Sequence, residues 1–87
     1  MNDIKISIVG AASAVFSLNL IRDLILTPNL DGSTINLMDV NEERLNAVYS
    51  LGRRYVSETN SKFKIEKTTN RKESLKGADF VINTALA

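Results

Sequence analysis

The 87-residue sequence contains neither cysteine nor histidine, and each absence removes a class of chemistry. Without cysteine the chain forms no disulfide and offers no thiol nucleophile. Without either residue type, a zinc or other transition-metal site within these residues is not expected. General acid–base catalysis by histidine is excluded as well.

An excess of charge of one sign is also lacking, because eleven Lys and Arg face ten Asp and Glu. The net charge of +1 provides no basic field, so we do not expect nucleic acid as a partner. The apolar stretch over residues 4–9 is interrupted by Lys5 and is too short for a signal peptide or a membrane helix. We therefore expect a cytoplasmic protein without a membrane partner.

Four short apolar runs alternate with longer segments of helical periodicity, which is typical of a parallel sheet. The first helix is expected to end near Leu26, since Pro28 disfavours helix in the residue before it. Gly52, inside the second helix, costs about 1 kcal/mol relative to alanine and predicts close packing against the sheet. Strands are expected over residues 4–9, 34–38, 63–68 and 79–84, and helices over residues 13–26, 41–58 and 70–77.

Right-handed connections between parallel strands predict the strand order 3-2-1-4. The expected fold is α/β, a Rossmann-like three-layer arrangement with a partial parallel sheet of about four strands. Residues 1–87 would form one unit, the N-terminal half of a dinucleotide-binding domain. Ligands of such sheets bind beyond the carboxyl ends of the strands. The fourth strand would be an open apolar edge, which predicts edge-to-edge association into a homo-oligomer.

The turn between the first strand and the first helix lies where a dinucleotide fingerprint would lie. Gly10 occupies the tight-turn position, while Ala12 and Val15 stand in place of the second and third glycines. Ser13 is a suitable N-cap, and together with Ala14 it keeps the loop slim. The free amides at the start of the helix favour an anion such as pyrophosphate. The loop alone is equally compatible with a plain strand-to-helix turn.

Polar residues end the second and fourth strands. Asp39 stands where an acid accepts hydrogen bonds from the adenosine ribose, and its charge would repel a 2′-phosphate, which favours NAD over NADP. The alternative is that Asp39 caps the following helix. Arg44 could lie over the adenine or pair with Glu43. Asn83 and Thr84 lie where the nicotinamide half would pass, or they only begin a loop.

Seven segments that together span nearly the whole chain have a specific wording. They are Gly10–Leu18, Arg22–Leu24, Leu26–Pro28, Gly32–Thr34, Leu37–Val40, Glu42–Leu45 and Ala78–Ala85. These segments resemble the opening of glycoside hydrolase family 4. The Ser-Ala-Val-Phe run and the Thr-Pro loop are closer to its α-glucosidase and α-galacturonidase branch than to the 6-phospho-glycosidase branch.

The resemblance implies the NAD-binding N-terminal segment of an α-glycosidase that transiently oxidises a sugar hydroxyl at C3. Oxidation acidifies the C2 proton, a divalent metal, typically manganese, stabilises the enediolate as the aglycone leaves, and after water adds the hydride returns. The partners implied are NAD and a small carbohydrate. By the same resemblance, the pyrophosphate is held by Gly10, Ala12, Ser13, Ala14 and Val15, the ribose by Asp39, the adenine by Arg44, and the nicotinamide side by Asn83 and Thr84.

Two departures from the family pattern matter. Ala12 stands where most members have glycine, which predicts a tighter approach of the pyrophosphate and weaker affinity. The family's metal ligands, a cysteine and a histidine, and its catalytic base lie downstream of residue 87, so the chain is expected to be inactive alone and to hold no catalytic residue. Two other functions stay open: the N-terminal part of a hydroxy-acid dehydrogenase, and a free-standing NAD-binding or sensor module.

Overall fold

The structure is a computed structural model that describes residues 4–11, 14–27 and 29–84. Within those ranges all of the expected strands and helices are present, each within one or two residues of its expected bounds. In chain order they are β1 (Lys5–Val9), α1 (Ala14–Leu26), β2 (Thr34–Met38), α2 (Glu42–Glu58), β3 (Lys64–Thr68), α3 (Arg71–Leu75) and β4 (Phe80–Asn83).

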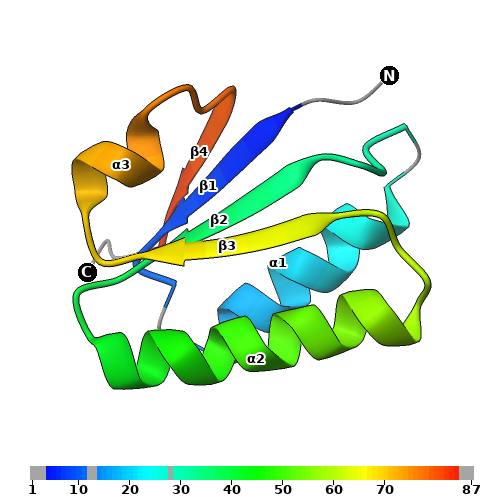
Figure 1. The fold of residues 1–87 in the computed structure, drawn as a ribbon, viewed down its shortest axis with the longest axis horizontal. Coiled ribbons are helices and arrows are strands. Elements are labelled where there is room, and N and C mark those ends of the chain that lie inside the picture. Colours follow the sequence, from blue (N-terminus) through cyan, green and yellow to red (C-terminus); the bar gives the residue numbers. More distant parts are fainter. Residues whose placement is uncertain (1–3, 12–13, 28, 85–87) are drawn as a thin grey trace.

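The strands form one parallel sheet in the order β3-β2-β1-β4, which confirms the predicted topology. Ile8 of β1 lies between Leu37 of β2 and Ile82 of β4. Helices α1 and α2 cover one face of the sheet and α3 covers the other, so the fold has three layers (Figure 1). Because all the strands are parallel, their carboxyl ends lie at one edge of the molecule, beside the start of α3.

The apolar core lies between the sheet and the α1–α2 layer. Alternation along β1 and β2 directs every second side chain to this layer, and α2 contributes the apolar positions expected from its periodicity. Tyr49, Tyr55 and Val56 of α2 pack around the core while remaining half-buried. The buried cluster consists of Ile8, Ala11, Ile21, Ile35, Leu37, Leu45, Val48 and Phe63.

The opposite face of the sheet is polar and meets α3 through hydrogen bonds. The Ser7 hydroxyl donates to the backbone carbonyl of Ser74, whose own hydroxyl donates to Asn36 Oδ1 at 2.8 Å. The Asn36 amide nitrogen then donates to Glu66 Oε1 at 3.3 Å. Ser7 and Ser74 are fully buried, so these directional contacts position α3 on the sheet.

The end of α3 is held by a side chain from β1. The Lys5 ammonium group donates to the backbone carbonyls of Lys76 at 2.7 Å and Glu73 at 3.1 Å. At the other end, the Asn70 side chain accepts from the Glu73 amide at 3.0 Å, so Asn70 is the N-cap of α3. None of the helices in the described ranges is long and apolar enough to cross a membrane.

Gly52 permits a close helix contact, although its main neighbour differs from the one expected. A Cβ atom at this position would lie 3.1 Å from Ile21 Cδ1 of α1 and 3.9 Å from Ile65 Cγ2 of the sheet. The expected packing against the sheet is present through Ile65, and the tighter contact, which was not expected, is with Ile21 of α1. Periodicity identifies the buried side of a helix but not the neighbour on that side.

Replacing this glycine with a larger residue tests the contact. We expect Gly52→Val to lower the free energy of unfolding by about 1–3 kcal/mol, because fully buried Ile21 has little room to move. Denaturant unfolding followed by circular dichroism measures the change. Ser50→Val, at an exposed position of the same helix, controls for the helix propensity of valine. An equal effect of both substitutions would contradict the packing argument.

The two outer strands differ in chemistry. β3 carries the charged residues Lys64, Glu66 and Lys67, which discourage pairing with another sheet. β4 instead exposes Phe80 by 59% and Val81 by 50%. β4 thus lacks the charges that protect β3, and its free edge is suited to pairing with another strand.

We expect the 87-residue chain to associate through β4 as its concentration rises. Size-exclusion chromatography with light scattering over a range of concentrations measures the molecular mass. Val81→Lys places a charge on this edge and should shift the population towards the monomer. Leu51→Lys, an exposed apolar position on α2, is the matched control. A monomer at every concentration would rule out edge pairing.

Candidate functional site

A groove of about 350 Å³ lies beyond the carboxyl ends of β1 and β2. Two residues expected at a binding site from the sequence, Gly10 and Asp39, lie in this groove together. It extends to the loop after β3 and to the start of α3. The lining residues are Val9, Gly10, Met38, Asp39, Val40, Thr69 and Arg71.

The turn after β1 is anchored to the end of β2. Gly10 has a φ of 85°, in the left-handed region that favours glycine. The amides of Gly10 and Ala11 both donate to the carbonyl oxygen of Met38, at 2.8 and 2.9 Å. Gly10 thus forms the tight turn expected from its position, and the turn is fixed relative to Asp39, the residue after Met38.

Two hydroxyl groups hold the carbonyls of the same turn. Thr84 Oγ1 lies 2.6 Å from the Gly10 carbonyl oxygen and 3.1 Å from that of Val9. Ser17 Oγ, fully buried in α1, donates to the Ala11 carbonyl oxygen at 2.8 Å. The carbonyl oxygens of Val9, Gly10 and Ala11 are therefore satisfied within the protein, which fixes the conformation of the turn.

The remaining residues of the predicted phosphate loop are only partly described. Ala12 and Ser13 lie outside the described residues, including the expected capping by Ser13. Ala14 and Val15 form the first turn of α1. The amides of a first helical turn have no partner within the helix.

Asp39 is held next to the start of α2 without capping it. The N-cap is Asn41, whose side chain accepts from the Arg44 amide at 3.0 Å. Asp39 Oδ1 accepts from the Asn41 amide at 2.9 Å, and the Asp39 amide donates to the Thr68 carbonyl at 3.3 Å. The alternative in which Asp39 itself is the cap is therefore wrong; Asp39 instead accepts from the backbone of the N-cap residue two positions later.

The predicted residues do not all meet in the groove. Arg44 is exposed on the first turn of α2, is not among the groove-lining residues, and forms no ion pair with Glu43 in the described part of the chain. Asn83 ends β4 opposite Val9, and Thr84 follows it, so both lie on the other side of the Gly10 turn.

Sequence reasoning missed the apolar lining residues Val9, Met38 and Val40, and it also missed three polar residues of this site. Thr69 and Arg71 line the groove, because β3 ends at the same edge of the sheet as β1 and β2. Ser17 was missed as well, although a small polar residue between Phe16 and Leu18 on an apolar helix could have indicated it. Thr69 and Arg71 could have been inferred from the predicted strand order, which places the end of β3 at the same edge of the sheet as the Gly10 turn.

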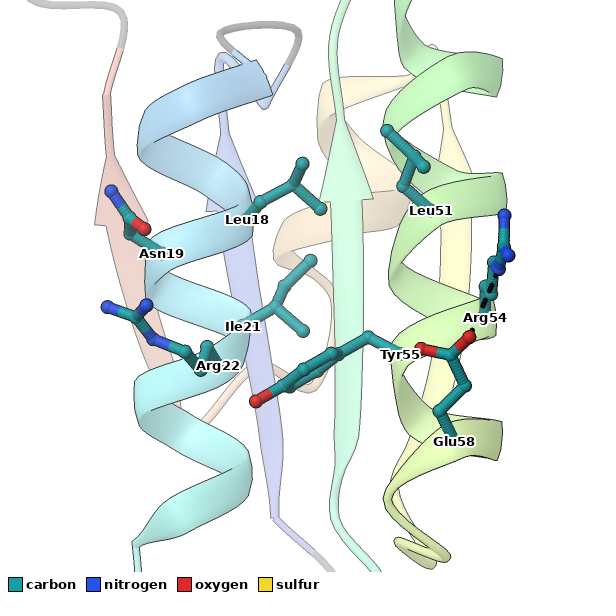
Figure 2. Close-up of a pocket in the computed structure, with 8 residues that line it drawn as sticks. All are labelled: Leu18, Asn19, Ile21, Arg22, Leu51, Arg54, Tyr55 and Glu58. Carbon is teal, nitrogen blue, oxygen red and sulfur yellow. Dashed lines mark hydrogen bonds and ion pairs between the residues drawn. The ribbon is translucent and has the colours of Figure 1, made fainter.

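A second groove of about 400 Å³ lies between α1 and α2, and side chains of both helices line it (Figure 2). Its arginines have partners: Arg54 Nε lies 3.2 Å from Glu58 Oε2, and Arg22 Nε lies 3.8 Å from Asp23 Oδ1. It has no strand end and no start of a helix, so it lacks the features that bind a nucleotide. It is lined by Leu18, Asn19, Ile21, Arg22, Leu51, Arg54, Tyr55 and Glu58.

Comparison with known protein families identifies the family of this chain. The family model described as "Family 4 glycosyl hydrolase" matches residues 5–87. This chain belongs to family 4 of the glycosyl hydrolases. The resemblance inferred from its sequence segments is thereby confirmed.

Relatives of this family 4 chain carry two kinds of name. The alpha-glucosidase of Erwinia rhapontici is 35% identical over 78 residues, which are 90% of this chain and 17% of the relative. The alpha-galactosidase of Rhizobium meliloti (strain 1021) is 31% identical over 83 residues, 95% of this chain and 17% of the relative. The alpha-galactosidase of Bacillus subtilis (strain 168) is 32% identical over 79 residues, 91% and 18% respectively. The chain thus spans about a sixth of the length of these relatives.

The hydroxyl of Thr84 offers a direct test of how the turn of this family 4 chain is held. We expect Thr84→Val to lower the free energy of unfolding by about 1 kcal/mol, because the Gly10 carbonyl loses its donor. Thr84→Ser should retain the stability. Thr27→Val is the matched control, since the exposed Thr27 hydroxyl donates to the Asp23 carbonyl, where water can replace it. Denaturant unfolding compares the variants, and equal losses at both threonines would contradict a special role for Thr84.

Proposed function

We propose that this chain is the NAD-binding N-terminal part of an α-glycosidase of family 4. The observation that carries the proposal is the groove in which the Gly10 turn and the Asp39 carboxylate lie together at the carboxyl ends of β1 and β2. This is the place where open parallel sheets bind dinucleotides. The family membership supports the glycosidase part of the proposal.

The described residues fit a dinucleotide. Gly10 turns the backbone sharply, and the start of α1 provides amides for the pyrophosphate. Ala12, Ser13, Ala14 and Val15 complete this loop in the proposal. Asp39, anchored through Asn41, would accept hydrogen bonds from the adenosine ribose.

The nicotinamide half would pass on the β4 side of the Gly10 turn, by Asn83 and Thr84. When bound, NAD supplies a hydride acceptor for the transient oxidation of a sugar hydroxyl. The residues of this chain bind the cofactor and orient it. The Thr84 hydroxyl acts here by holding the Gly10 carbonyl, and so by shaping the loop that faces the cofactor.

We propose an α-glycoside as the substrate of the intact enzyme, because relatives are named alpha-glucosidase and alpha-galactosidase. The manganese ion is assigned no ligand in this chain: the described residues contain no cluster of three His, Cys, Asp or Glu side chains able to hold a metal. Metal ligands and the catalytic base would come from outside this segment, and the chain alone would be inactive.

A comparison of NAD with NADP tests the cofactor assignment. We expect the chain to bind NAD more tightly than NADP, because the Asp39 charge repels a 2′-phosphate. Asp39→Asn keeps an oxygen for the Asn41 amide but removes the charge, so it should reduce the preference for NAD by about tenfold or more. Isothermal titration calorimetry of both nucleotides with both proteins measures the dissociation constants.

Asp31→Asn, an exposed acid whose Oδ1 accepts from the Lys62 amide, is the control for loss of a negative charge. It should leave the ratio of the two dissociation constants unchanged. Absence of NAD binding by a chain with native circular dichroism would contradict the proposal for this segment. An unchanged ratio in Asp39→Asn would remove Asp39 from the ribose site.

A further inference from the structure

One residue that lines the groove carries a guanidinium group without a partner among the described residues. Arg71 is the first residue of α3 and lines the groove together with Asp39 and Val40. In the described part of the chain its guanidinium group forms no hydrogen bond, ion pair or ring contact. The side chain is exposed, so it is accessible to a ligand in the groove.

Three other arginines of the chain are engaged. Arg22 pairs with Asp23, Arg54 pairs with Glu58, and the Arg53 guanidinium carbon lies 5.7 Å from the centroid of the Tyr49 ring. Arg71 differs from these three in having no side-chain partner among the described residues, and it lines the groove that contains Asp39. The planar guanidinium group of arginine stacks well on flat rings that are rich in π electrons.

Apolar residues line the same groove. Val40 follows Asp39 and is 82% exposed, although valine is usually buried. Val9 and Met38 complete the apolar lining. A groove lined by both apolar side chains and an arginine suits a flat aromatic ring.

We propose that Arg71 stacks on the adenine base of the bound dinucleotide, with Val40 contacting the other side of the ring. The inference rests on the proposed function and adds the residue that recognises the base. It transfers the adenine contact from Arg44, which does not line the groove, to Arg71. The residue binds through the planar face of its guanidinium group, so lysine cannot replace it fully.

The test separates the base from the rest of the cofactor. Dissociation constants of the 87-residue chain are measured by calorimetry for NAD, for ADP-ribose and for nicotinamide mononucleotide, which lacks adenine. We expect Arg71→Ala to weaken NAD and ADP-ribose about tenfold, in line with the loss of a stacked base, and to leave the mononucleotide unchanged. Arg71→Lys, which keeps the charge, should also weaken the two adenine ligands severalfold.

Two further arginine variants complete the design. Arg53→Ala removes a charge from an exposed position of α2 outside the groove and should leave all affinities unchanged. Arg44→Ala decides between the two candidates for the adenine contact and should also have no effect on NAD. We expect Arg71→Ala to keep the fold, because Arg71 is exposed and alanine is a good helix former. Circular dichroism checks the fold of each variant.

The outcomes distinguish this inference from the function on which it rests. If the unmodified chain binds NAD and Arg71→Ala binds it equally well, the inference is wrong and the proposed function stands. If Arg71→Lys retains full affinity, the contact is one of charge, and stacking is wrong. If the unmodified chain binds neither NAD nor ADP-ribose, the proposed function itself fails, and the inference fails with it.

Discussion

The carbonyl oxygen of Met38 accepts hydrogen bonds from two successive amides, those of Gly10 and Ala11. Through this one acceptor the turn after β1 is joined to the end of β2, so the backbone beside Asp39 and the backbone at Gly10 have one fixed spacing. The parallel register of β1 and β2 makes the contact possible, because Val9 pairs with Met38 at the last position of both strands. A shift of one residue would separate the turn from the acid and turn the core side chains of β2 to the opposite face.

The hydroxyls of Ser17 and Thr84 complete this arrangement from two other elements. One belongs to the helix after the turn and the other follows the neighbouring strand β4. A short backbone turn can bind an anion only when its peptide groups are already oriented, since ordering them upon binding would cost free energy. The hydroxyls of Ser17 and Thr84 orient the turn although neither residue lines the groove.

Much of the fold was predictable, because it depends on local patterns. Alternation along β1 and β2, the Asn70 cap and the right-handed connections determine the elements and their order. The groove was less predictable, because its walls come from three strand ends that are distant in the sequence. Gly10 and Asp39 could be identified by position, whereas Arg71 has no motif and acquires its place only when β3 pairs beside β2. Gly52 shows the same limit: its helical environment indicated close packing, but only the tertiary structure shows that Ile21 is the neighbour.

The two faces of the sheet are joined to their helices by different forces. Apolar contacts hold α1 and α2, and such contacts tolerate small sliding movements because they have little directional preference. The buried hydrogen bonds from Ser7 and Asn36 to Ser74 are directional, and a displaced helix would leave buried polar atoms unpaired. Helix α3 has only five residues, so it buries little area against the sheet, but the hydrogen bonds fix its position and direction. This fixed geometry matters for residues outside the contact, since the position of the α3 backbone sets the direction in which the Arg71 side chain extends from the helix. Polar residues under a short helix thus act as an alignment device, which an apolar surface of equal or greater stability would not provide.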